Sequence, residues 1–186
     1  MTRELPVNIT ICQSVLQSQN METALVSFAE MGVTDVIPIY TERVLKPRQP
    51  KQEETQQAYT RWVRRFVKNS LRDITPIVHE PMDFTDAVKL IPDCDVAILA
   101  YENQHDPMCT AKALAECKNG KNIIVFIGPE RGFDPGEVEL AKKAGAHIVS
   151  LGNRIIRAAN AGAILLGMLV YILELHGETK GGENIV

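Results

Sequence analysis

Residues 123–157 constrain the fold more than any other stretch of this chain, because strand and turn signals alternate within them. Residues 123–127 form an uninterrupted apolar run, which is typical of a strand buried on both faces. Gly128 and Gly132 follow this run, and glycine permits a positive φ or a close approach of the backbone to a ligand. A second short strand is predicted over residues 149–151, directly before another glycine. Because open α/β sheets bind ligands at the carboxyl ends of their strands, the two loops predict a small-molecule site.

Strands and helices alternate along the rest of the chain. A capping box at Asp134 and Glu137, with Pro135 between them, starts one helix. Further strands are predicted over residues 7–12, 36–40, 74–78 and 95–101, and further helices over residues 21–31, 53–72, 83–91, 107–118 and 158–173. This alternation predicts an α/β protein with a mostly parallel sheet flanked by helices. Pro38 predicts that its strand lies near an edge or bends.

The length and the cysteines limit the class of protein. A chain of 186 residues fits one domain with a sizeable core, which we expect over residues 1–176, with a disordered polar tail over residues 177–186. The four cysteines show neither a C-x-x-C pair nor zinc spacing, so we expect reduced thiols in a cytoplasmic protein without a metal. The sequence contains no P-loop and no nucleophile elbow, which argues against nucleotide hydrolysis and acyl transfer.

Positive charge is concentrated in one part of the chain. The net charge is −3, yet residues 43–72 carry nine basic residues and only two acidic ones. In the helix predicted over residues 53–72, apolar side chains recur at helical spacing at Tyr59, Trp62, Val63, Phe66 and Val67. The opposite face carries Arg61, Arg65, Lys68 and Arg72. Such a face is either a solvated surface or a contact for a partner.

The last helix, predicted over residues 158–173, is almost free of charge. A helix that is apolar all round is either buried or in a membrane, and this one is shorter than the roughly 20 residues that a membrane span needs. We therefore expect no membrane partner. One face is expected to pack on the sheet and the other on a second copy of the chain, with Gly162 and Gly167 allowing close helix contact.

Several motifs together resemble one known family. Ile-Gly-Pro-Glu-Arg-Gly-Phe-Asp at residues 127–134 and Leu-Gly-Asn-Arg-Ile-Ile-Arg at residues 151–157 resemble the motifs of the 16S rRNA uridine-N3 methyltransferases, the RsmE family. Residues 30–33, 41–43 and 70–72 resemble further segments of the same family, in the same order. This family belongs to the SPOUT, or trefoil-knotted, methyltransferases.

The resemblance implies a fold, a cofactor and partners. It implies a SPOUT methyltransferase domain with a C-terminal trefoil knot, S-adenosylmethionine (SAM) as the cofactor, small-subunit ribosomal RNA as the substrate, and a homodimer formed through the last helix. The implied SAM-binding residues lie in three loops: Leu99, Ala100, Tyr101, Ile127, Gly128, Glu130, Gly132, Leu151, Gly152, Ile155 and Ile156. Without the resemblance, the glycines would be read equally well as tight turns.

The resemblance also suggests roles for charged residues. Methyl transfer requires alignment of the uridine N3, the methyl carbon and the sulfur. Arg154 and Arg157 are candidates to stabilise negative charge on the uracil or a phosphate, and Glu130 is a candidate general base or SAM-orienting acceptor. Alternatively, the two arginines pair with acids at the dimer interface. The candidate contacts with RNA phosphates are Arg43, Arg61, Arg65, Lys68 and Arg72.

The sequence departs from the family pattern at several points. Arg131 replaces the first glycine of a Gly-Gly pair, and Ala-Ala-Asn-Ala at residues 158–161 replaces Thr-Glu-Thr-Ala. Family members also carry an N-terminal RNA-binding barrel of PUA type, and this sequence resembles only the part that follows it. Two other functions therefore stay open: a 2′-O-ribose methyltransferase of the same superfamily, or a SAM- or RNA-binding relative that no longer methylates.

Overall fold

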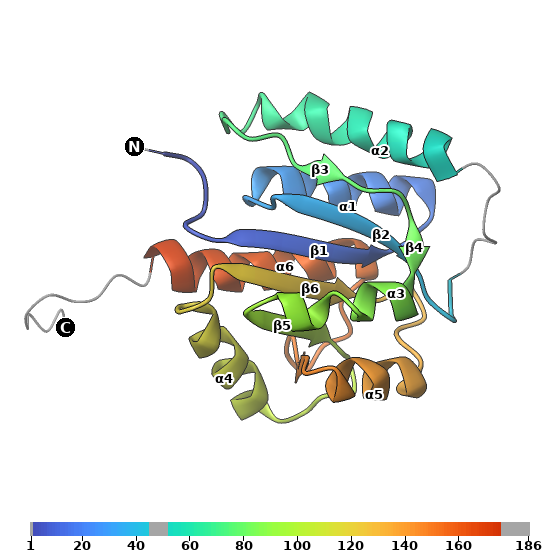
Figure 1. The fold of residues 1–186 in the computed structure, drawn as a ribbon, viewed down its shortest axis with the longest axis vertical. Helices are drawn as coiled ribbons and strands as arrows, with labels where there is room; N and C mark the ends of the chain where they lie inside the picture. The colour runs from blue at the N-terminus through green and yellow to red at the C-terminus, as the bar shows by residue number, and fades with distance from the viewer. Residues whose placement is uncertain (1, 45–51, 176–186) are drawn as a thin grey trace, which may run out of the picture.

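The computed structural model describes residues 2–44 and 52–175, and its centre is a single parallel sheet (Figure 1). The strand order is β3-β2-β1-β6-β5-β7, with the short β4 also paired to β2, and every strand pair is parallel. The strands are β1 (Asn8–Ser14), β2 (Asp35–Tyr40), β3 (Ile77–Val78), β4 (Met82–Asp83), β5 (Val96–Ala100), β6 (Asn122–Ile127) and β7 (His147–Val149). The predicted parallel α/β sheet is confirmed.

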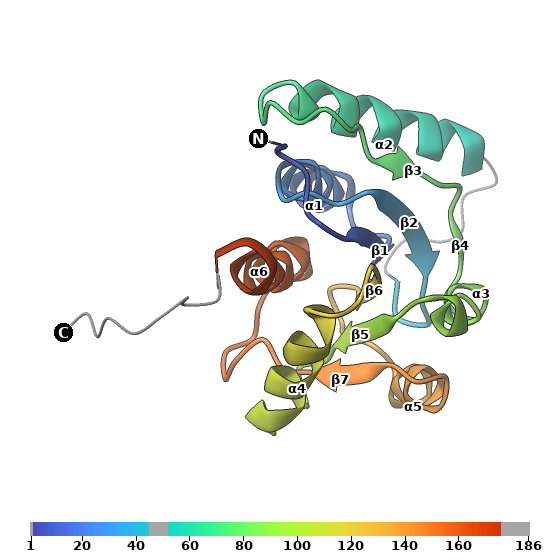
Figure 2. The same cartoon turned by 60° about the vertical axis from the view of Figure 1, so that its left-hand side comes forward.

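Helices cover both faces of the sheet, as Figure 2 shows. The helices are α1 (Ser18–Glu30), α2 (Gln52–Val67), α3 (Phe84–Val88), α4 (Pro107–Cys117), α5 (Pro135–Lys143) and α6 (Ala158–Val170), with a 3₁₀ turn at Ile91–Asp93. The first apolar cluster joins one face of the sheet to α1, α4 and α6, and α2 packs outside α1. The second cluster joins the other face to α3 and α5. Because both faces are covered, the central strands are buried along almost their whole length.

Several elements differ from their predicted extents. The helix predicted over residues 53–72 ends at Val67, and the chain then turns through Leu71, which has a φ of 57°. The helix predicted over residues 83–91 is divided into α3 and the 3₁₀ turn, and β7 lies two residues earlier than predicted. Pro38 lies one strand from the sheet edge, between the residues that pair with β3 and those that pair with β4, as its missing N–H favours. The predicted tail over residues 177–186 lies outside the described residues.

The last helix is longer than predicted. A π-helical turn, Tyr171–Leu175, continues α6 to give one helix of 18 residues, Ala158–Leu175. Its mean hydropathy is 1.8, so by length and composition alone it is long and apolar enough to cross a membrane. In the fold, this helix packs against α1 and β6, and the side chains of Leu165, Leu166 and Leu169 are fully buried. A core helix of a globular domain has the same composition.

Gly162 allows this close packing of α6. A Cβ at this position would overlap the ring of Phe28 in α1 and would lie 3.2 Å from Ile11 Cδ1. We expect Gly162→Ala to lower the free energy of unfolding by about 1–3 kcal/mol, because the packed core cannot make room without strain. Gly167→Ala is the matched control, since its Cβ would meet only Met31 Cε at 3.7 Å. The control should instead stabilise the helix by about 0.5–1 kcal/mol in urea unfolding. Equal effects of the two substitutions would contradict this packing.

Candidate functional site

A cavity of about 400 Å³ opens where β5, β6 and β7 end. These strands are neighbours in the sheet, so the loops that follow them lie side by side. The cavity volume is in the range of sites that bind small molecules. The lining residues are Asn20, Ala100, Tyr101, Glu102, Ile127, Gly128, Pro129, Glu130, Arg131, Gly132, Phe133, Leu151, Gly152, Arg154, Ile155, Ile156, Arg157, Ala158, Ala159 and Ala161.

Two of the predicted turns depend on glycine. Gly132 has a φ of 69° and Gly152 a φ of 107°, a region that side-chain-bearing residues rarely occupy. A Cβ at Gly132 would also overlap the carboxylate of Glu102, which projects from the loop after β5. The loops after β5 and β6 therefore approach each other closely, at a contact between the Gly132 backbone and the Glu102 carboxylate.

The loop after β6 is fixed at its end by buried groups. Phe133 is fully buried, with its ring centroid 5.5 Å from that of Phe84. Asp134 accepts a hydrogen bond from the Gly136 N–H (2.9 Å), and Glu137 accepts one from the Asp134 N–H (2.9 Å), so the predicted capping box at the start of α5 is confirmed. Burial raises the pKa of Glu137 above its ordinary value, although the two backbone N–H donors it binds favour the ionised form.

Glu130 connects this loop to the start of α1. Its Oε1 accepts hydrogen bonds from the Gln17 N–H (3.2 Å) and from Asn20 Nδ2 (3.4 Å). Gln17 is the N-cap residue of α1 and makes no capping bond with its own side chain. Glu130 therefore places a carboxylate at the helix N-terminus, where unpaired N–H groups and the helix dipole favour negative charge.

The cavity lining also carries positive charge. Arg131, Arg154 and Arg157 line it and are exposed, and Arg157 is also the N-cap residue of α6. The first turn of α6 contains no acidic residue, and Ala159 lies there, buried, in the cavity wall. A helix N-terminus together with three guanidinium groups favours the binding of a carboxylate or a phosphate.

The structure brings together nearly all the predicted site residues. Ten of the eleven predicted SAM-binding residues line the cavity, as do the predicted catalytic residues Arg154, Arg157 and Glu130. Leu99 is the exception, because it lies within β5 and its side chain is fully buried in the second apolar cluster. Asn20 was not predicted, since it comes from α1 and no local sequence pattern connects it with the loops.

The predicted basic surface is confirmed in part. Arg61 and Arg65 are exposed on α2, opposite the buried Tyr59 and Val63, and Lys68 is exposed in the turn directly after this helix. These cations are therefore accessible to a polyanion.

Arg43 is half-exposed but already bonded within the chain. Its Nη2 lies 3.1 Å from Asp134 Oδ2, and its Nη1 donates to the Arg131 carbonyl at 3.4 Å. The structure thus places Arg43 against the loop after β6.

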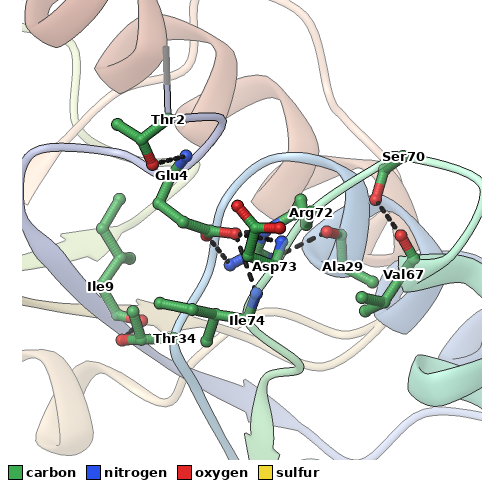
Figure 3. Close-up of polar contacts among 10 residues, drawn as sticks. All are labelled: Thr2, Glu4, Ile9, Ala29, Thr34, Val67, Ser70, Arg72, Asp73 and Ile74. Carbon is green, nitrogen blue, oxygen red and sulfur yellow. Dashed lines mark hydrogen bonds and ion pairs between the residues drawn. The ribbon is translucent and has the colours of Figure 1, made fainter.

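The predicted place of Arg72 on the exposed basic face is wrong, because its side chain is bonded to Glu4 and to the Ala29 carbonyl (Figure 3). Its side chain is 2% exposed and donates to Glu4 Oε2 through Nη2 (2.7 Å) and Nε (3.0 Å), and to the Ala29 carbonyl through Nη1 (2.8 Å). Glu4 Oε1 accepts from the backbone N–H groups of Asp73 and Ile74 at 3.0 Å each. Because α2 ends before this residue, helical spacing did not apply, and Arg72 instead joins the N-terminal segment to α1.

Metal chemistry is not indicated by the described part of the chain. Within residues 2–44 and 52–175, no group of three or more His, Cys, Asp or Glu side chains lies close enough to hold a metal ion. The four cysteines are free thiols, and burial raises the pKa of Cys117 to about 12, which disfavours its thiolate at neutral pH.

A parallel α/β sheet with a cavity between glycine-containing loops at its carboxyl edge is the arrangement in which open α/β proteins bind small molecules. The family model of the RNA methyltransferase domain matches residues 3–170. The chain therefore belongs to the RNA methyltransferase family, which confirms the predicted resemblance.

Named relatives agree with this assignment. The chain is 32% identical over 173 residues to the ribosomal RNA small subunit methyltransferase E of Synechocystis sp., with 92% of this chain and 55% of that protein covered. It is 25% identical over 158 residues to the protein of the same name from Mesomycoplasma hyopneumoniae, with 85% of this chain and 67% of that protein covered. The chain thus spans between about half and two thirds of the length of these relatives.

Solved structures share the fold. The Neisseria gonorrhoeae ribosomal RNA small subunit methyltransferase E bound to SAM aligns with a TM-score of 0.82 and 24% identity, covering 91% of this chain and 68% of that one. An AdoMet-bound rRNA methyltransferase from Sinorhizobium meliloti aligns with a TM-score of 0.59 and 16% identity, covering 93% of this chain and 59% of that one.

Proposed function

We propose that this chain is a SAM-dependent ribosomal RNA methyltransferase that methylates N3 of a uridine in small-subunit 16S rRNA. The observation that carries the proposal is the convergence of three loops, after β5, β6 and β7, on one cavity. Family membership supports methyl transfer to RNA. The names of the relatives support the small-subunit target.

The cavity has the features that SAM requires. Ile127, Leu151 and Ile156 provide apolar surface for an adenine ring, and the bends at Gly132 and Gly152 bring main-chain atoms to the cavity wall. The arginines and the N-terminus of α6 favour the carboxylate of the methionine part. When bound, SAM supplies a methyl group that its sulfonium already activates. The chain's own task is then to hold the uridine N3 in line with it.

The arginines are the residues we assign to charge stabilisation. Neutral N3 is a weak nucleophile, so transfer requires that the N3 proton passes to solvent water and that the negative charge left on the uracil oxygens is stabilised until the N–C bond to the methyl group forms and the sulfonium leaves as a neutral thioether. Arg154 and Arg157 line the cavity and supply donors for those oxygens or for an adjacent phosphate. The exposed cations Arg61 and Arg65 on α2, and Lys68 directly after it, are suited to contact phosphates elsewhere on the RNA.

The proposed fold includes a C-terminal trefoil knot and a homodimer. The knot is supported by the path of the chain, because α6 packs beside β6 and α1 although the strand before it, β7, is at the far edge of the sheet. The homodimer is supported by apolar side chains left exposed along the last helix, at Ile164 (37%), Tyr171 (54%) and Leu175 (70%). Light scattering coupled to gel filtration gives the mass that tests the homodimer.

Glu130 is expected to act as an orienting acceptor and not as the general base. Glu130→Gln keeps an oxygen for the Gln17 N–H, so we expect kcat to fall less than tenfold. Glu130→Ala removes the acceptor and should cost about 0.5–2 kcal/mol of stability, the usual cost of a lost N-cap. Exposed Glu139 on α5 is the matched control for the charge change. A loss of 10²–10⁴-fold in kcat for Glu130→Gln alone would instead make it the base.

The direct test of the function is transfer of a tritiated methyl group from SAM to small ribosomal subunits that lack the modification. We expect incorporation into one uridine, and mapping of the product to N3. Mapping to the ribose would favour the 2′-O-methyltransferase alternative. SAM binding without transfer would favour a relative that no longer methylates, an alternative supported by Ala159 in place of the family glutamate.

A further inference from the structure

The segment that follows β2 is bonded to the loop that follows β6. Arg43 Nη2 lies 3.1 Å from Asp134 Oδ2, and Arg43 Nη1 donates to the Arg131 carbonyl at 3.4 Å. The Glu42 N–H donates to Glu137 Oε1 at 3.0 Å. These three bonds connect two segments that are about 90 residues apart in the sequence.

The segment that carries Arg43 is itself anchored. Thr41 is buried, and its Oγ1 lies 2.8 Å from the Oγ of the buried Ser14 at the end of β1. Glu137 is also buried and binds both segments, because Oε1 accepts from the Glu42 N–H and Oε2 from the Asp134 N–H at 2.9 Å. The backbone next to Arg43 is therefore held in place by hydrogen bonds at Thr41 and Glu42.

The contacts of Arg43 bracket the part of the loop that forms the cavity. Arg131, Gly132 and Phe133 line the cavity, and the two groups that Arg43 binds, the Arg131 carbonyl and the Asp134 carboxylate, lie at either end of this stretch. The preceding residue of the loop is held from the other side, where Glu130 binds the start of α1. Without Arg43, the outer half of the loop would lose its side-chain anchor to the β2 segment.

We propose that Arg43 is a positioning residue that holds residues 131–134 in the shape the cofactor cavity needs. This inference rests on the proposed function, since the cavity is the proposed SAM site. It replaces the prediction that Arg43 contacts an RNA phosphate.

The test is Arg43→Gln, measured by calorimetry with SAM and by steady-state methyl transfer. The ion pair is partly exposed, with side-chain exposures of 39% and 42%. We therefore expect a rise of about two- to fivefold in the Kd and KM for SAM, the upper part of the range that pairs of this kind produce. The kcat at saturating SAM should stay within about twofold, because Arg43 does not touch the reacting atoms, and a general loss of structure would lower kcat as well.

Two further variants identify the partner. Asp134→Asn keeps the Oδ1 acceptor of the helix cap and removes the charge, so it should raise the Kd for SAM like Arg43→Gln, and the double variant should be no worse than either single one. Lys89→Gln is the matched control, since it breaks an exposed ion pair with Asp86 that lies outside the cavity lining. It should leave the Kd for SAM unchanged.

The opposite pattern overturns the proposal. If Arg43→Gln leaves the Kd for SAM unchanged and weakens RNA binding as much as Arg61→Gln does, Arg43 is a phosphate contact. Additive effects of Arg43→Gln and Asp134→Asn would also contradict it. If the wild-type chain shows no binding of SAM at all, the proposed function fails first, which the same titration distinguishes from failure of the inference.

Discussion

Arg157→Gln and Arg154→Gln are each expected to lower kcat for methyl transfer by about 10²–10³-fold, the usual cost of removing one donor to a developing negative charge. Both side chains line the cavity, and Arg157 stands at the N-terminus of α6, where the helix dipole adds to its charge. The KM for SAM should change much less than kcat. Single-turnover transfer to unmodified small subunits measures the effect.

The alternative role of these arginines predicts a different result. If they pair with acids at a dimer interface, the substitutions should dissociate the dimer, and activity should return at high protein concentration. Lys142→Gln, an exposed cation on α5, is the control for a general change in charge. A kcat within tenfold of the wild type, with an intact dimer, would contradict the catalytic assignment.

Arg72→Met is expected to lower the free energy of unfolding by about 2–4 kcal/mol, because it removes the guanidinium partner of Glu4 and the donor to the Ala29 carbonyl, and leaves the Glu4 carboxylate only its two backbone N–H donors. For a domain of this size, the loss corresponds to a decrease in Tm of about 4–16 °C. Calorimetric unfolding measures it. Arg61→Met on the exposed face of α2 is the matched control and should change stability by less than about 0.5 kcal/mol.

The pH dependence gives an independent check on the same ion pair. Burial opposes ionisation of Glu4, but the hydrogen bonds from Arg72, Ile74 and Asp73 outweigh it and lower the pKa below the ordinary 4.5. Because the pKa of Glu4 is lower in the folded state than in the unfolded state, the ionised carboxylate stabilises the fold above pH 4.5. This stabilisation is lost as the pH falls through the lowered pKa. The difference in Tm between the wild type and Glu4→Gln should therefore shrink below pH 4.5. A difference that does not depend on pH would contradict this account.

The sequence predicted the parts of the fold that depend on local signals. The run over residues 123–127 indicated a buried strand, and the capping box at Asp134 marked the start of α5, because both signals lie within a few neighbouring residues. The positions of Gly132 and Gly152 indicated loops at strand ends. That these loops meet follows only from the order of strands, in which β6, β5 and β7 are neighbours.

The parts that were missed depend on contacts between distant segments. Arg72 is four residues after Lys68 and fits a helical stripe, but its partner Glu4 lies 68 residues earlier in the chain. Asn20 and Arg43 reach the loop after β6 from α1 and from the end of β2, over separations of 110 and 91 residues. Periodicity carries no information on such pairs, because it records only neighbours within one element.

Titration of the purified chain with SAM, together with a crystal soaked in SAM, tests the central claim most directly. We predict one SAM per chain in the cavity between the loops after β5, β6 and β7, with loss of binding in Gly132→Ala. Gly145→Ala also replaces a glycine with a positive φ (108°) but lies outside the cavity lining, so it should still bind SAM. No binding by the wild-type chain, or equal binding by Gly132→Ala, would contradict the account.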